Sequence, residues 1–144
     1  MLRDGDARSE VAWTGAAGAV RADSWQAIDR ALRAVAKRRC ALDAEEAQLL
    51  AQAICGEIWR RLGKASLHEY LEDVLGYSPR LATERIRIAT ALDDLPALTE
   101  ALARGELHYS AVRELTRVAV RATEAQWLAH ARGQSLRQIE QAVA

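Results

Sequence analysis

The chain has 144 residues, enough for one domain with a buried core, and its 20 basic and 20 acidic residues give a net charge of zero. A neutral chain has no general attraction to nucleic acid, so a nucleic-acid function would require local clusters of basic residues. Half of the residues are hydrophobic, phenylalanine is absent and only two prolines occur, a composition that favours helices over strands. No apolar run approaches the roughly 20 residues of a transmembrane helix, and the N-terminus lacks a signal-peptide core, so we expect a cytoplasmic protein.

The first part of the chain divides into an arm and a long helical segment. Residues 1–23 show no sustained periodicity, and we expect them to form a flexible N-terminal arm. From Ser24, a suitable helix cap, apolar residues recur at steps of three and four, which predicts helix over residues 24–62. A weak break at residues 40–43 leaves two interpretations open, one long helix or a helical hairpin. A single helix of that length would be an obvious dimerisation element, so a homodimer through residues 24–62 is one expectation.

The next part begins with a short helix, a glycine-containing turn and a longer helix, which together form a helix-turn-helix-like unit over residues 66–95. Ser78–Pro79 gives the longer helix a strong start signal, a serine cap followed by proline at the first helical position. Shorter helices are expected over residues 97–144, and the last one, capped by Ser135, is still running at the end of the chain, as expected of a domain cut from a longer protein. The predicted fold is an all-α multi-helix bundle with long N-terminal helices, and its helical domain covers residues 24–144.

The polar face of the longer helix carries the candidate DNA-binding residues. In a helix-turn-helix protein the first helix braces the second, whose exposed N-terminal part enters the major groove, where arginine contacts guanine edges and phosphates. Basic side chains ahead of the turn are candidates for contacts with the phosphate backbone. The alternative is that the segment joins two ordinary bundle helices and that its polar face is only solvated. The candidate set is Ser78, Arg80, Thr83, Arg87, Arg60, Arg61 and Lys64.

Arg85 lies inside the apolar arc of the same predicted helix. A buried guanidinium requires an acidic partner, because the uncompensated charge would be costly away from water. We expect the partner to be an acid of the preceding helix, and this pair would belong to the scaffold instead of the DNA-binding surface. The candidates are Glu69, Glu72 and Asp73.

The remaining chemically distinctive residues indicate structural roles. Cys40 and Cys55 make no metal-ligand spacing and are expected to be buried free thiols. The three histidines are far apart in sequence, so no metal site and no cofactor are predicted. A phosphate-binding glycine loop and a nucleophile–base pair are both missing, so no catalytic residue is predicted and the chain is not expected to be an enzyme by itself. Three tryptophans on apolar helix faces are expected to anchor the core: Trp25, Trp59 and Trp127.

Five short segments of the chain match a known pattern: Leu75–Arg80, Glu84–Arg87, Leu95–Pro96, Gly105–Leu107 and Tyr109–Ser110. Through them, roughly residues 25–144 resemble the helical N-terminal region of bacterial HNH-endonuclease-type proteins. The middle of the chain is also similar to the helix-turn-helix of ParB-type partition proteins, although the His108–Tyr109 insertion departs from that pattern. The resemblance implies that the parent protein acts on DNA, that a nuclease module would follow this region, and that this part is a recognition or assembly domain.

The sequence therefore predicts a DNA-binding helical domain, the non-catalytic part of an HNH-nuclease-like protein, with double-stranded DNA as its partner. A longer parent protein with an HNH module would be the enzyme. The alternative is a protein-interaction or dimerisation module that makes no direct contact with nucleic acid.

Overall fold

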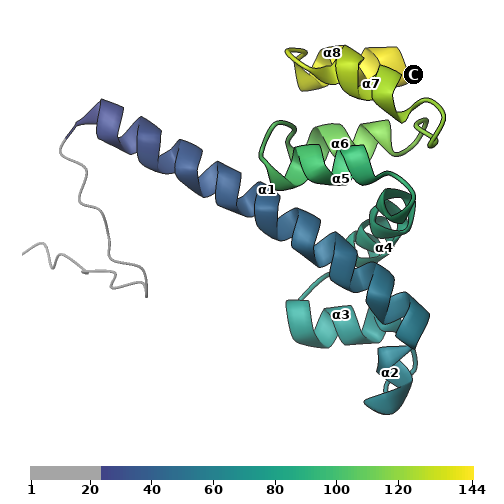
Figure 1. The fold of residues 1–144 in the computed structure, drawn as a ribbon. Helices are drawn as coiled ribbons and strands as arrows, with labels where there is room; N and C mark the ends of the chain where they lie inside the picture. The colour runs from purple at the N-terminus through teal and green to yellow at the C-terminus, as the bar shows by residue number, and fades with distance from the viewer. Residues whose placement is uncertain (1–23) are drawn as a thin grey trace, which may run out of the picture. The chain divides into compact units, whose positions relative to one another are not determined.

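The computed structural model describes residues 24–144, and the arm predicted for residues 1–23 lies outside the described residues. The described part of the chain contains helices and no strand, which confirms the predicted all-α fold. The described residues divide after Arg33 into two units, and the second, Ala34–Ala144, contains every helix after α1. The helices are α1 (Trp25–Gly56), α2 (Ile58–Arg61), α3 (Leu67–Leu75), α4 (Pro79–Asp93), α5 (Pro96–Ala103), α6 (Tyr109–Leu115), α7 (Glu124–Ala131) and α8 (Leu136–Val143) (Figure 1).

Helix α1 runs without a break through residues 40–43, so the first of the two interpretations, one long helix, describes this segment. The helix ends at Gly56, because Glu57 adopts the left-handed conformation with φ 47° and separates α1 from the short helix α2. Continuity has a packing reason: a break at residues 40–43 would rotate the residues after it out of register with the core. The buried face of α1 recurs at steps of three and four and consists of Cys40, Ala44, Ala47, Leu50 and Ala53.

The turn between α3 and α4 has the chemistry that the sequence predicts. Gly76 ends α3 at φ 68°, and its amide and that of Tyr77 bond back to the last turn of α3, which satisfies carbonyls that the helix end leaves open. The Ser78 Oγ then accepts a hydrogen bond from the Leu81 amide at 3.2 Å and caps α4. Helix α4 therefore begins abruptly, with its first turn exposed.

The C-terminal helices close the core in pairs, with α7 against α5 and α8 against α6. Ser135 and Gln138 form the expected capping box at the start of α8. The first turn of α5 has a cap from a distant residue: the Glu124 Oε1 accepts a hydrogen bond from the Leu98 amide at 2.8 Å. The largest fully buried side chains are Leu71, Ile88, Leu95, Leu98, Leu102, Val112, Leu115 and Ile139.

Replacing Glu124 with alanine is expected to lower the free energy of unfolding by about 2 kcal/mol, because the buried Leu98 amide would lose its acceptor. Glu124→Gln keeps an acceptor oxygen at the same position and should cost less. Urea denaturation of the two variants measures the difference. Equal losses would show that the amide does not depend on this acceptor.

Two predictions about burial are wrong. Cys40 is buried as predicted, but Cys55 is exposed, since it lies near the end of α1 away from the buried face of that helix. Trp25 is 74% exposed, and among residues 24–39 no side chain joins the core cluster. Trp59 and Trp127 are partly buried and pack against the core.

Candidate nucleic-acid interface

The four candidate residues of the turn and of α4 line one exposed groove of about 630 Å³. Ser78 and Arg80 lie at the start of α4, and Thr83 and Arg87 follow one and two turns later on the same face. The opposite wall comes from Arg113 on α6 and from Arg117, which lies in the turn just after that helix. The groove therefore collects arginines from two parts of the chain that are separated in sequence.

Positive charge exceeds negative charge in this groove. Arg113 Nε lies 3.2 Å from Glu114 and 3.7 Å from Glu84, and Arg117 Nε lies 3.7 Å from Glu114. These two carboxylates offset part of the charge of Arg113 and Arg117. Arg80 is exposed, and no carboxylate within residues 24–144 forms an ion pair with it. The groove therefore has a net positive charge although the whole chain is neutral.

Arg87 joins the two walls of the groove. Its guanidinium donates to the Thr116 Oγ1 at 3.4 Å and to the Arg113 carbonyl at 3.3 Å. Both bonds are long for N–H···O hydrogen bonds, so they orient the side chain weakly. The guanidinium retains further N–H groups for a ligand.

The Thr83 hydroxyl is already hydrogen-bonded within the chain. It donates to the Pro79 carbonyl at 2.9 Å, and the His68 Nε2 lies 3.1 Å from the same oxygen. Since the hydroxyl proton is directed to Pro79, the imidazole must be the donor in the second bond. His68 on α3 therefore holds Thr83, a residue that lines the groove, from behind the groove itself.

The other three candidates, Arg60, Arg61 and Lys64, do not line the groove. They lie in α2 and just after it, beside α3. Arg60 pairs with Glu57 at 3.2 Å, and Lys64 pairs with Asp73. The hydrogen bond that the Lys64 ammonium donates to the Asp73 carboxylate raises the pKa of Lys64, and the carboxylate offsets the charge of the ammonium. Of the three, Arg61 forms no ion pair within the described residues.

Arg85 is largely buried, as predicted, but the expected pairing with Glu69, Glu72 or Asp73 is wrong. Its Nη1 lies 2.7 Å from the Asp43 Oδ1 and 3.1 Å from the Glu46 Oε2, both on α1. The sequence suggested the neighbouring helix as the partner, whereas this side of α4 packs on α1. Arg85 therefore belongs to the scaffold, with partners about 40 residues earlier in the chain.

Two tyrosines complete the cluster around Arg85. The guanidinium carbon lies 3.9 Å from the centre of the Tyr109 ring on α6, and the Tyr77 hydroxyl donates to the Glu46 Oε1 at 2.5 Å. Burial and the bond to Glu46 raise the pKa of Tyr77 to about 12, and burial also raises the pKa of Tyr109. Both phenols stay neutral at physiological pH. The cluster links α1, the turn, α4 and α6, and so holds the two walls of the groove together.

A known domain family matches the part of the chain that contains the groove and the Arg85 cluster. The family described as "Domain of unknown function (DUF222)" matches residues 29–144, which is most of the chain. The chain belongs to the DUF222 family. The arginine groove and the Arg85 cluster both lie within the DUF222 match, whereas Trp25 and Ile28 precede it. Neither the curated proteins nor the solved structures include a match to the chain.

Two further observations concern the described part of this DUF222 chain. Within residues 24–144, no three histidine, cysteine, aspartate or glutamate side chains are grouped so that they could hold a metal ion. No described helix combines the length and the apolar character needed to cross a membrane.

Sequence reasoning missed Arg113, Arg117 and His68 as members of the candidate site. The two arginines are four residues apart, the spacing of one helix face, and this signal was present in the sequence although α6 ends at Leu115, before Arg117. That this face adjoins α4 depends on how α4 and α6 pack around Arg85, which periodicity does not determine. His68 reaches Thr83 only because α3 and α4 pack side by side.

Proposed function

We propose that this domain binds double-stranded DNA in the cytoplasm through the arginine groove, as the non-catalytic part of an HNH-nuclease-like protein. The observation that carries the proposal is the gathering of Arg80, Arg87, Arg113 and Arg117 around one exposed groove in a chain of zero net charge. Phosphate contacts dominate affinity for DNA, and arginine suits them because its planar donors bind phosphate oxygens in pairs.

The arrangement of α3 and α4 supports entry of α4 into the major groove. The first turn of α4 is exposed, and it presents Ser78, Arg80 and Thr83 beyond the bracing helix α3. In this proposal Arg80 and Arg87 reach base edges, and Arg113 and Arg117 contact phosphates on the flank. The resemblance of this unit to the ParB-type helix-turn-helix belongs to the same proposal.

Arg60, Arg61 and Lys64 would make secondary contacts with the DNA backbone. Arg61 is the strongest of these candidates, since Arg60 and Lys64 already pair with Glu57 and Asp73. Exposed pairs of this kind are worth little, so DNA phosphates can replace the carboxylates at small cost.

The membership of the family supports an HNH-containing parent protein. Domains of this family are typically found at the N-terminus of HNH-endonuclease-containing proteins. In that arrangement this domain would recognise DNA, and the metal-dependent cleavage would belong to the nuclease module. Residues 24–144 would then bind DNA without cleaving it.

The salt dependence of duplex binding tests the proposed function. We expect the logarithm of the binding constant to fall linearly with the logarithm of salt concentration, with a slope of about −3 to −4 if four arginines each displace a counterion. Fluorescence anisotropy with a labelled duplex at several salt concentrations measures this slope. Absence of binding at low salt, or binding insensitive to salt, would contradict the proposal.

A second candidate function is association of two copies through residues 24–62, with no requirement for DNA. The exposure of large apolar side chains along α1 favours it, because such side chains gain stability when a partner covers them. The exposed set is Trp25, Ile28, Leu32, Leu42 and Leu49. The two functions are compatible, since helix-turn-helix proteins commonly bind DNA as dimers.

A further inference from the structure

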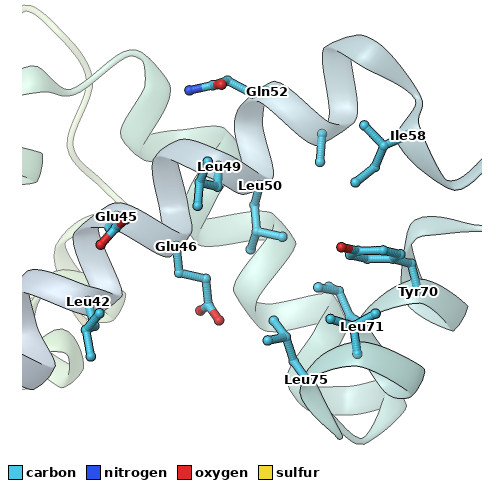
Figure 2. A pocket seen from close by; sticks show the side chains of 12 residues that line it. Leu42, Glu45, Glu46, Leu49, Leu50, Gln52, Ile58, Tyr70, Leu71 and Leu75 are labelled. Carbon is cyan, nitrogen blue, oxygen red and sulfur yellow. The ribbon is translucent and has the colours of Figure 1, made fainter.

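The second compact unit has an apolar groove of about 720 Å³ between α1 and α3. Figure 2 shows its lining: Leu50 on α1 points towards Tyr70 and Leu71 on α3, with Leu42 further along α1. The inner part is buried, whereas the edges are open to solvent. The exposed edge residues are Leu42 (62%), Leu49 (56%), Val74 (56%) and Leu75 (43%).

The edge on α1 has the spacing of a coiled-coil seam. Val35, Leu42 and Leu49 follow one another at steps of seven residues, so they lie along one face of the helix. Val35 is half-buried and the other two are exposed. A seam of this kind fits a second helix that runs along α1 and covers the groove.

The charges beside the seam identify the partner helix and its direction. Arg38 and Arg39 precede Leu42, whereas Glu45 and Glu46 follow it, so one half of the segment is basic and the other acidic. Two copies of α1 in parallel would place like charges opposite one another. Two copies in antiparallel orientation would place the basic half of each against the acidic half of the other.

We propose that this groove and seam form a symmetric interface in which α1 of a second copy of the chain lies antiparallel to α1. This inference rests on the pairing of two copies stated above as a second candidate function. The two-fold axis passes beside Leu42, which meets the partner's Leu42, and Leu49 meets the partner's Val35. Such an interface uses the same surface on both copies and closes on itself.

The symmetry forms each ion pair twice. With Leu42 at the axis, Arg38 faces the partner's Glu45 on one flank, and Arg39 faces the partner's Glu46 on the other. No ion pair occupies Arg38 or Glu45 within the described residues, so both are available to a partner. Glu46 already accepts hydrogen bonds from Arg85 and Tyr77, so the Arg38–Glu45 pair carries the test.

The test measures the mass of the full chain by light scattering over a range of concentrations, expecting a dimer. Leu42→Glu should raise the dissociation constant at least tenfold, since it places two carboxylates at the axis. Its control is Val120→Glu, another exposed apolar residue outside the groove. Arg38→Glu and Glu45→Arg should each weaken the dimer about tenfold, and the double variant should restore it.

The direction of the helices is tested with a spin label on the exposed Cys55, because the buried Cys40 does not react readily. Cys55 lies 13 residues from Leu42, so two labels in an antiparallel pair lie at least roughly 40 Å apart at 1.5 Å per residue. In a parallel pair they would lie within roughly 30 Å, given helix axes about 8–10 Å apart.

The possible results distinguish a chain that does not dimerise from a dimer whose α1 helices are not antiparallel. A chain that stays monomeric at every concentration overturns both. A dimer that Leu42→Glu leaves intact, or one with the shorter label distance, overturns the antiparallel interface alone. Duplex binding, measured separately, bears on the arginine groove and not on this interface.

Discussion

Replacement of Arg80 and Arg87 by alanine together is expected to lower the affinity for duplex DNA by about 10²- to 10⁴-fold, since each arginine contact contributes about 1–3 kcal/mol. Both side chains line the groove, and the Arg80 side chain is exposed. If both contact phosphate or displace counterions, the salt slope should also fall by about 2 in magnitude. Anisotropy titrations of the double variant and the unchanged chain measure both quantities.

The matched control removes two arginines outside the groove. Arg104→Ala with Arg132→Ala changes the net charge by the same amount, and these side chains pair with Glu100 and Glu106 on the exposed surface. We expect this control to bind DNA nearly as well as the unchanged chain. An equal loss in the two double variants would mean that net charge, and not the groove, governs binding. Urea denaturation confirms that each variant is folded.

Replacement of Arg85 by alanine is expected to lower the free energy of unfolding by about 3 kcal/mol or more. Its side chain is only 17% exposed, and it serves Asp43 and Glu46 at once while it lies over the Tyr109 ring. Without the guanidinium the two carboxylates remain close together with no cation between them. Urea denaturation at neutral pH measures the loss.

Two comparisons make this result specific. Arg85→Lys keeps the charge but not the planar donor set, so its loss should fall between those of the alanine variant and the unchanged chain. Arg104→Ala removes an exposed pair with Glu100 and should cost less than about 1 kcal/mol. A loss below that value for Arg85→Ala would show that the cluster does not stabilise the fold.

The sequence by itself determined the helices and where several of them begin. The start of α4 is marked by Ser78–Pro79, and the start of α8 by Ser135, since a serine cap satisfies amides that the helix leaves open. Gly76 marks the end of α3, because its positive φ suits a residue without a Cβ. These signals are local, and short-range hydrogen bonds enforce them whatever the rest of the chain does.

The sequence also placed three candidate site residues on one face of α4, with Ser78 as the cap of that helix, and it placed Arg85 inside. Helical periodicity alone suffices for both, because it determines which residues of one helix share a face. The face holds Arg80, Thr83 and Arg87, and the structure brings these three and Ser78 together in one groove.

Only the tertiary structure decided which helices meet. Packing places the partners of Arg85 on α1 and brings Arg113 of α6 and Arg117, just after α6, to the groove. It also keeps Lys64 away from the groove. It also left Leu42 and Leu49 exposed beside an apolar groove. The physical reason is that packing of helix against helix depends on the shapes and charges of residues far apart in the chain, whereas periodicity and caps depend on neighbours.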